Sequence, residues 1–203
     1  MRLHNAGKYN GDESSLPHRD DPPNAVPFKE PEDMKKLSII GNTGAILTMI
    51  VFLIPFIILA KGYFKDNDIW IPIAMICAAL IGPIHEFLHA ICFKEDVYYY
   101  SNLKQGMLFV VGTEDMSKKR FILMCLCPNI ILGFIPYIFF LIFPNIIFLG
   151  VFGTLCIGSG FGDYMNVFNA IRQVPKGAKV YMNGMHSYWY AKEKTNDNPS
   201  LDD

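Results

Sequence analysis

Two histidines and a glutamate form the pattern His-Glu-Phe-Leu-His at positions 85–89, inside a stretch that is otherwise apolar. On a helix, residues four apart lie on one face about one turn apart, so His85 and His89 can bind the same metal ion. Glu86 would stand beside them, placed to take a proton from a metal-bound water. Zinc lowers the pKa of such a water to about 7 and so makes a nucleophile at neutral pH. The alternative is a structural cluster that makes hydrogen bonds to neighbouring helices.

A catalytic zinc usually takes three protein ligands and a water. Asp163 is the best candidate for the third ligand, because it and His85 each lie eight residues, or about 12 Å, from the same end of their apolar stretches. Asn129 lies at the same depth in a third stretch, where it would hold a substrate carbonyl or serve as a structural amide. His186 is a weaker rival for the third ligand. The alternative for Asp163 is a helix cap or an ion pair with Arg172.

Long apolar stretches must position these residues. The chain has 203 residues, of which 51% are hydrophobic and 18% are charged, and no Asp, Glu, Lys or Arg occurs in residues 37–60 or 121–162. About 20 apolar residues cross the hydrocarbon core of a bilayer. We therefore predict an all-α polytopic membrane protein with about four transmembrane helices, at about 38–60, 69–93, 121–143 and 146–171. The alternative is a soluble protein with very apolar core helices.

Glycine and proline interrupt three of the predicted helices near the candidate site. Gly82-Pro83 predicts a kink just before the histidines, and Pro128 frees backbone groups in the third helix. Three glycines would let the fourth helix approach its neighbours closely or break near Asp163, namely Gly158, Gly160 and Gly162.

Short strands are expected outside the membrane. Residues 98–100 and 107–111 flank a turn around Gly106, and residues 179–182 and 186–190 flank Asn183-Gly184, which is typical of a type I′ hairpin. Such a ribbon either caps helix ends, which we favour, or pairs with an extended peptide. The five cysteines form no CxxC pair, so neither a disulfide framework nor a thiolate zinc site is indicated.

The distribution of charge predicts the topology. Four spans divide the Lys and Arg residues 16 to 2 between the two sides, which places both termini in the cytoplasm and the hairpins on that side. We expect three parts: a disordered cytoplasmic tail at 1–36, a transmembrane domain at 37–172, and a cytoplasmic hairpin and tail at 173–203. The 18 Lys and Arg nearly balance the 19 Asp and Glu, which argues against a nucleic-acid partner.

The residues around the motif resemble those of a known family. Three segments carry the resemblance: Gly-Pro-Ile-His-Glu-Phe-Leu-His-Ala at 82–90, Ser-Gly-Phe-Gly-Asp at 159–163, and Val-Pro-Lys-Gly-Ala-Lys-Val at 174–180. They resemble the zincin peptidases of small bacterial membrane proteins, a group related in pattern to the site-2 intramembrane proteases. The resemblance covers about residues 70–190 and implies a Zn²⁺ site made by His85, His89 and Asp163, with Glu86 as general base.

The chain departs from the site-2 pattern at two places. It reads Gly-Asp-Tyr where those proteases have Leu-Asp-Gly, and Pro128-Asn129 where they have Asn-Pro. We predict an intramembrane zinc metallopeptidase that cleaves membrane-associated polypeptides near the cytoplasmic face. One rival is a non-catalytic membrane module of the same fold that binds a partner or assists assembly, although such a module has no need of Glu86. A metal or proton transporter fits poorly because no inverted repeat is evident.

Overall fold

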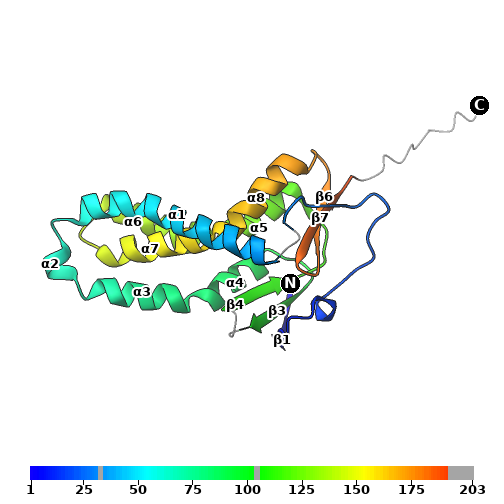
Figure 1. Ribbon diagram of the computed structural model, residues 1–203, viewed down its shortest axis with the longest axis horizontal. Helices are drawn as coiled ribbons and strands as arrows, with labels where there is room; N and C mark the ends of the chain where they lie inside the picture. Colours follow the sequence, from blue (N-terminus) through cyan, green and yellow to red (C-terminus); the bar gives the residue numbers. More distant parts are fainter. Residues whose placement is uncertain (32–33, 103–105, 192–203) are drawn as a thin grey trace, which may run out of the picture.

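The computed structural model describes residues 1–31, 34–102 and 106–191, and the molecule is elongated with two unlike ends (Figure 1). One end is a bundle of apolar helices. The other end holds two small β-sheets together with α4, α5 and α8, and we call these the helical half and the strand half. Helices account for 56% of the chain. The prediction of an all-α protein with hairpins is therefore too simple, because several strands lie outside the two expected hairpins.

The helices, in chain order, are α1 (Met34–Ala60), α2 (Phe64–Asn67), α3 (Trp70–Leu80), α4 (Gly82–Ala90), α5 (Lys118–Pro128), α6 (Ile135–Ile142), α7 (Ile147–Ser159) and α8 (Phe161–Gln173), with a 3₁₀ turn η1 (Glu13–Ser15) and a π-helical segment η2 (Asn129–Phe134). Among the described residues, Lys35–Ala60 and Lys118–Ile142 are long and apolar enough to cross a membrane. The number rises to four if each of the bent pairs α3–α4 and α7–α8 is one span. The bounds agree closely with the four stretches predicted from the sequence.

Both bends occur where glycine and proline predict them. The α3–α4 pair bends by 46° at Ile81, and Pro83 lies in the first turn of α4, where its missing N–H costs no hydrogen bond. The α7–α8 pair bends by 50° at Gly160. Pro128 ends α5, and the helix continues through η2 with a wider turn. The two bends place α4 at an angle to α3 and α8 at an angle to α7.

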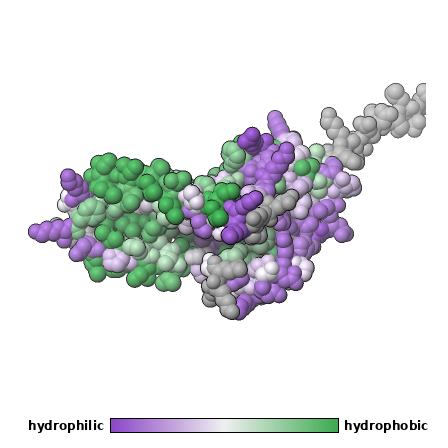
Figure 2. Space-filling model, viewed as in Figure 1, coloured by the Kyte–Doolittle hydropathy of each residue, from purple (hydrophilic) through white to green (hydrophobic). Residues whose placement is uncertain are grey.

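The helical half presents large apolar side chains outward as well as inward. Ile58 on α1 and Leu80 on α3 are 68% and 72% exposed, and α6 presents Ile142 in the same way. Figure 2 shows this half covered by hydrophobic residues, whereas hydrophilic residues cover the strand half. An apolar surface this extensive is typical of helices surrounded by lipid rather than by water.

The two sheets lie side by side in the strand half. The first has the order β1–β3–β4, and the second has the order β2–β7–β6–β5. The strands are β1 (Arg2–Lys8), β2 (Val26–Pro27), β3 (Asp96–Asn102), β4 (Met107–Val111), β5 (Met116–Ser117), β6 (Lys179–Asn183) and β7 (His186–Tyr190). The antiparallel pairs β3–β4 and β6–β7 confirm the two predicted hairpins.

The turn of the second hairpin differs in detail from the prediction. Asn183 pairs with His186, so the two loop residues are Gly184 and Met185 rather than Asn183 and Gly184. Of these two loop residues, only Gly184 has a positive φ, of 62°. A positive φ at the first loop residue alone is the pattern of a type II′ turn, whereas type I′ needs it at both.

Residues 1–31, which we call the N-terminal strap, are folded where a disordered tail was expected. β1 pairs in parallel with β3, and β2 pairs with β7, so the strap adds a strand to each sheet. Phe28 and Leu16 are each 4% exposed, which gives this proline-rich segment apolar anchors. Tyr181 donates a hydrogen bond to Asp21 (2.8 Å), and burial together with that bond raises the pKa of Tyr181. Residues 32–33 of the predicted tail, and 192–203 of the predicted C-terminal part, lie outside the described residues.

Candidate metal centre

Two short helices bring the predicted ligands together. His85 and His89 lie on α4, and Asp163 lies in the first turn of α8. The Nε2 atoms of the histidines are 3.1 Å apart. Each Nε2 lies 3.3 Å from an oxygen of the Asp163 carboxylate, Oδ2 for His85 and Oδ1 for His89. The bend at Gly160 turns α8 so that Asp163 meets α4, and a straight helix would continue the direction of α7 instead.

The arrangement of these donors fits a zinc ion. Donors held about 2.0–2.1 Å from a tetrahedral zinc lie about 3.3 Å from one another. The two Nε2 atoms are 3.1 Å apart, and each lies 3.3 Å from one oxygen of the Asp163 carboxylate, which is close to that spacing. Two imidazoles and one carboxylate are also donor types that zinc prefers. A carboxylate oxygen of Glu86 lies within 4.8 Å of both histidines. Asp163 lies 3.3 Å from both rings, whereas among the described residues Glu86 forms no ion pair with either ring, so the geometry favours Asp163 as the ligand and leaves Glu86 beside the site.

The ring of His89 is held in the form that a metal requires. Its Nδ1 lies 2.9 Å from the backbone carbonyl oxygen of Met124 on α5. Because a carbonyl can only accept, Nδ1 carries the proton and donates it, so that in the neutral ring the lone pair is on Nε2. His89 is 7% exposed, so water competes little for this bond. The Met124 carbonyl belongs to the backbone and gives no signal in the sequence.

Asn129 supports Asp163 from behind. Its Nδ2 donates to Asp163 Oδ2 (2.7 Å) and to the Cys125 carbonyl oxygen (3.1 Å). The side chain is 1% exposed and fits against Gly160, where a Cβ atom would overlap its Oδ1. Asn129 Oδ1 itself has no hydrogen-bond partner among the described residues. The geometry therefore favours the second of the two roles expected for Asn129, a structural amide, which here positions Asp163.

A polar cluster fixes the far end of α4. Glu114 is 6% exposed and accepts hydrogen bonds from the backbone N–H groups of Lys94 (2.7 Å) and Glu95 (2.6 Å). Arg120 on α5 pairs with Glu114 and donates to the Cys92 carbonyl oxygen just beyond α4 (2.8 and 3.0 Å). Satisfied buried polar groups of this kind hold one arrangement of the chain. The cluster thereby ties α4 to α5, the helix that supplies Met124.

The metal centre faces a cavity of about 280 Å³ between the two sheets. His85, Glu86, His89 and Asp163 form one side of it. Phe109 and Val110 of β4 and Met182 and Ser187 of the second sheet are among the residues of the other side. Glu86 therefore lines this cavity beside both histidines.

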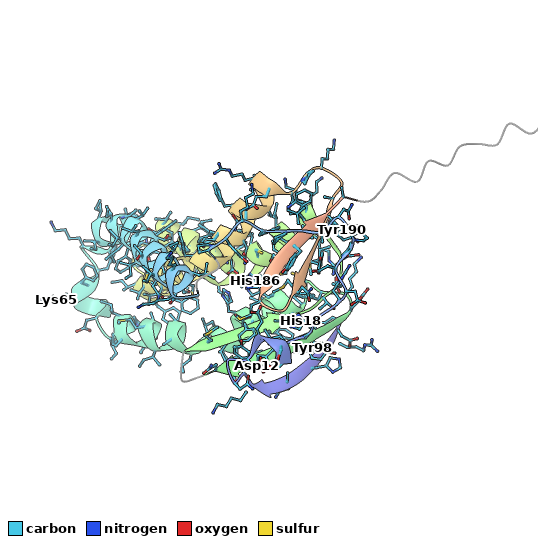
Figure 3. The ribbon with its side chains drawn as sticks, turned by 45° about the vertical axis from the view of Figure 1, so that its right-hand side comes forward. Asp12, His18, Lys65, Tyr98, His186 and Tyr190 are labelled. Carbon is cyan, nitrogen blue, oxygen red and sulfur yellow. The ribbon has the colours of Figure 1, made fainter. Side chains whose placement is uncertain are left out.

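A second cavity, also of about 280 Å³, reaches Asp163 from the side of the strap and α1. Asn166, one turn after Asp163 on α8, lines both cavities, although nothing in the sequence singled it out. His186, the rival third ligand, lines the second cavity but not the first. It lies 3.0 Å from Glu30 and 3.5 Å from Glu13 of the strap rather than beside the other histidines. In Figure 3, His186 and His18 mark the place where the strap crosses the β6–β7 hairpin.

Comparison with known proteins gives one match. A family model described as "Putative zincin peptidase" matches residues 78–179, a range that includes α4, both hairpin strands β3 and β4, and α8. No curated protein and no solved structure matches the chain.

Proposed function

The chain belongs to the family described as putative zincin peptidases, and on this premise we propose that it is an intramembrane zinc metallopeptidase of the site-2 protease type. The observation that carries the proposal is the meeting of His85 Nε2, His89 Nε2 and the Asp163 carboxylate within 3.3 Å. These residues would hold the zinc. When bound, zinc polarises a peptide carbonyl and lowers the pKa of a coordinated water to about 7.

Each protein group has a distinct task in this proposal. Glu86 accepts a proton from the attacking water, whose oxygen forms a bond to the peptide carbonyl carbon. Glu86 then passes that proton to the amide nitrogen as the C–N bond breaks, so that an amine and a carboxylic acid are released. The Met124 carbonyl and the Asn129 amide keep His89 and Asp163 in their orientations. Asn166, which faces the cavity, is placed to contact the substrate backbone.

The position of the site at the junction of the two halves supports a substrate at the membrane surface. In this proposal the helical half lies in the bilayer, and the strand half and both termini lie in the cytoplasm. The 16-to-2 division of Lys and Arg favours this orientation, since only Lys61 and Lys65 lie at the far end of the helical half. The substrates would be polypeptides that span the membrane or lie on its cytoplasmic surface.

Replacement of Glu86 by Gln tests the mechanism. The purified E86Q variant should keep about one zinc per chain and lose peptidase activity by about 10²–10⁴-fold, because the amide cannot take up a proton. Zinc content is measured by mass spectrometry, and cleavage is measured on a fluorogenic transmembrane peptide in detergent. The matched control is Glu95→Gln, which removes an exposed carboxylate just beyond α4. Full activity in E86Q would refute the mechanism, and a wild-type protein without zinc would favour the partner-binding module.

A further inference from the structure

Two adjoining cavities form one groove along the outer face of α8, away from the metal centre. The first, of about 410 Å³, is lined by Phe161, Tyr164, Met165 and Phe168 of α8 and by residues 29–31 of the strap. The second, of about 540 Å³, is lined by Val26, Lys29, Phe168, Asn169, Arg172, Gln173 and Trp189. They share Lys29, Phe168 and Asn169, so an apolar end and a cationic end are continuous.

The cationic end carries two positive charges and no negative one. Lys29 and Arg172 are both exposed, and no Asp or Glu is among the described residues that line this second cavity. The Arg172 guanidinium lies 5.8 Å from the centre of the Phe168 ring. The one acid of the apolar end is Glu30, which lies 3.0 Å from His186, so the described lining of the groove carries two cations and one acid. The local charge of the groove therefore attracts an anion.

The groove lies where the apolar helices give way to the strand half. Phe168 and Ile171 are 58% and 59% exposed, beside the cationic Arg172 and the indole of Trp189. Exposed apolar side chains, a tryptophan and basic residues at one level are typical of a membrane–water interface. Gln173 of α8 joins the two walls there. Gln173 Oε1 accepts the backbone N–H of Lys29 (2.7 Å), and Gln173 Nε2 donates to Asn169 (2.9 Å).

We propose that this groove binds one anionic phospholipid. Lys29 and Arg172 contact the lipid phosphate, and an acyl chain lies on Phe161, Met165 and Phe168. The shape and charge distinguish this ligand from two others. A free phosphate leaves the apolar end empty, and a zwitterionic lipid gains little net attraction from two cations. Two basic residues at a membrane surface together favour an anionic over a zwitterionic lipid by about 30-fold.

Quenching of Trp189 by brominated lipid tests the proposal. The chain has two tryptophans, so a Trp70→Phe background leaves Trp189 as the only one. The full chain is reconstituted in brominated phosphatidylcholine with increasing unbrominated phosphatidylglycerol. The loss of quenching as phosphatidylglycerol takes the site should report a preference of about 30-fold. The double variant K29A/R172A should lower this preference to about one, and R172K should retain it.

The matched control is K61A/K65A, which removes the same two charges from the opposite end of the helical half, where Figure 3 labels Lys65. It should leave the preference unchanged. The proposal is refuted if K29A/R172A keeps the preference while its circular dichroism and gel-filtration profile match those of the background protein. It is also refuted if K61A/K65A loses the preference equally, or if inorganic phosphate at the same concentration displaces the brominated lipid. None of these outcomes bears on the E86Q test, because the groove does not include the metal centre.

Discussion

Gly160→Ala is the sharpest perturbation of the metal centre that leaves all its ligands in place. Gly160 has φ −77° and ψ 11°, which alanine adopts without strain. The effect is therefore purely steric. A Cβ atom at this position would overlap Asn129 Oδ1, and the other two nearest atoms, at 2.5 and 3.0 Å, also belong to the Asn129 amide. The amide must move, and its hydrogen bond to Asp163 Oδ2 is broken.

The structure indicates the size of two effects. Forcing a methyl group into this packed contact should lower the free energy of unfolding by about 1–3 kcal/mol. Loss of the Asn129–Asp163 hydrogen bond, which involves a charged acceptor, should lower the zinc affinity by about 10–100-fold, as is typical when a group that orients a ligand is removed. Zinc affinity is measured by competition with a chelating dye, and stability by thermal unfolding in detergent.

Two variants make the reasoning falsifiable. Gly162→Ala, two residues away, is the matched control, because a Cβ there meets no atom within 4 Å and its cost should be near zero. In an Asn129→Ala background the amide is gone, so G160A should cost less than about 1 kcal/mol. An equal cost of G160A in both backgrounds would show that the overlap with Asn129 is not its cause.

Two further predictions concern zinc and pH. Zinc at 100 times its dissociation constant should raise the free energy of unfolding by about 2.7 kcal/mol, which is measured as a rise in the unfolding temperature. A chelator should reverse this rise. A rise that persists in His85→Ala would mean that zinc binds elsewhere. The hydrogen bond from His4, together with Arg2, lowers the pKa of Asp96 below its ordinary value. Because a lowered pKa stabilises the ionised form, the β1–β3 pair should be most stable above about pH 4 and weaken as the pH falls further. Hydrogen-exchange protection of β1 should then fall on acidification, and in the Asp96→Asn variant it should be low at neutral pH. Equal protection in the wild-type protein and in Asp96→Asn at pH 6 would contradict this.

Local signals in the sequence were sufficient for most of the helical half. Charge-free stretches set the lengths of the helices, and Gly82-Pro83 and Gly160 stand where α4 and α8 begin. Such signals act within one or two turns of backbone, so no distant partner is needed to interpret them. The same holds for the β6–β7 hairpin, although its two loop residues, Gly184 and Met185, lie one position later than predicted.

The strap could not be predicted because its order depends on distant partners. β2 has only two residues, one of them Pro27, and its partner Trp189 is more than 160 positions away. β1 carries polar residues in a pattern without apolar alternation. Isolated apolar residues such as Phe28 predict an ordered segment only when the core against which they pack is known. Composition alone therefore indicates disorder for a segment whose order is tertiary.

In the candidate site, too, the features set by one helix could be predicted and those set by packing between elements could not. The spacing of His85 and His89 is a property of one helix, and the depth of Asp163 follows from the lengths of two predicted helices. The proximity of the three side chains could therefore be predicted. The metal-binding roles of all three stay predictions. The position of Asn129 beside the Asp163 carboxylate depends on the space left by the missing side chain of Gly160 on another helix, which no spacing rule describes. Asn166 and the contact of His186 with Glu30 likewise arise from how separate elements pack.

The pairing of β2 with β7 also has a consequence for biosynthesis. Ribosomes make the chain from its N-terminus, so Val26 and Pro27 leave the ribosome long before Tyr188 and Trp189, the residues they pair with. β1 likewise can pair only after residues 96–101 have been made. The strap is thus made before the strands that it pairs with, and the wall that Glu30 contributes beside Asp163 is completed only after β7 has been translated.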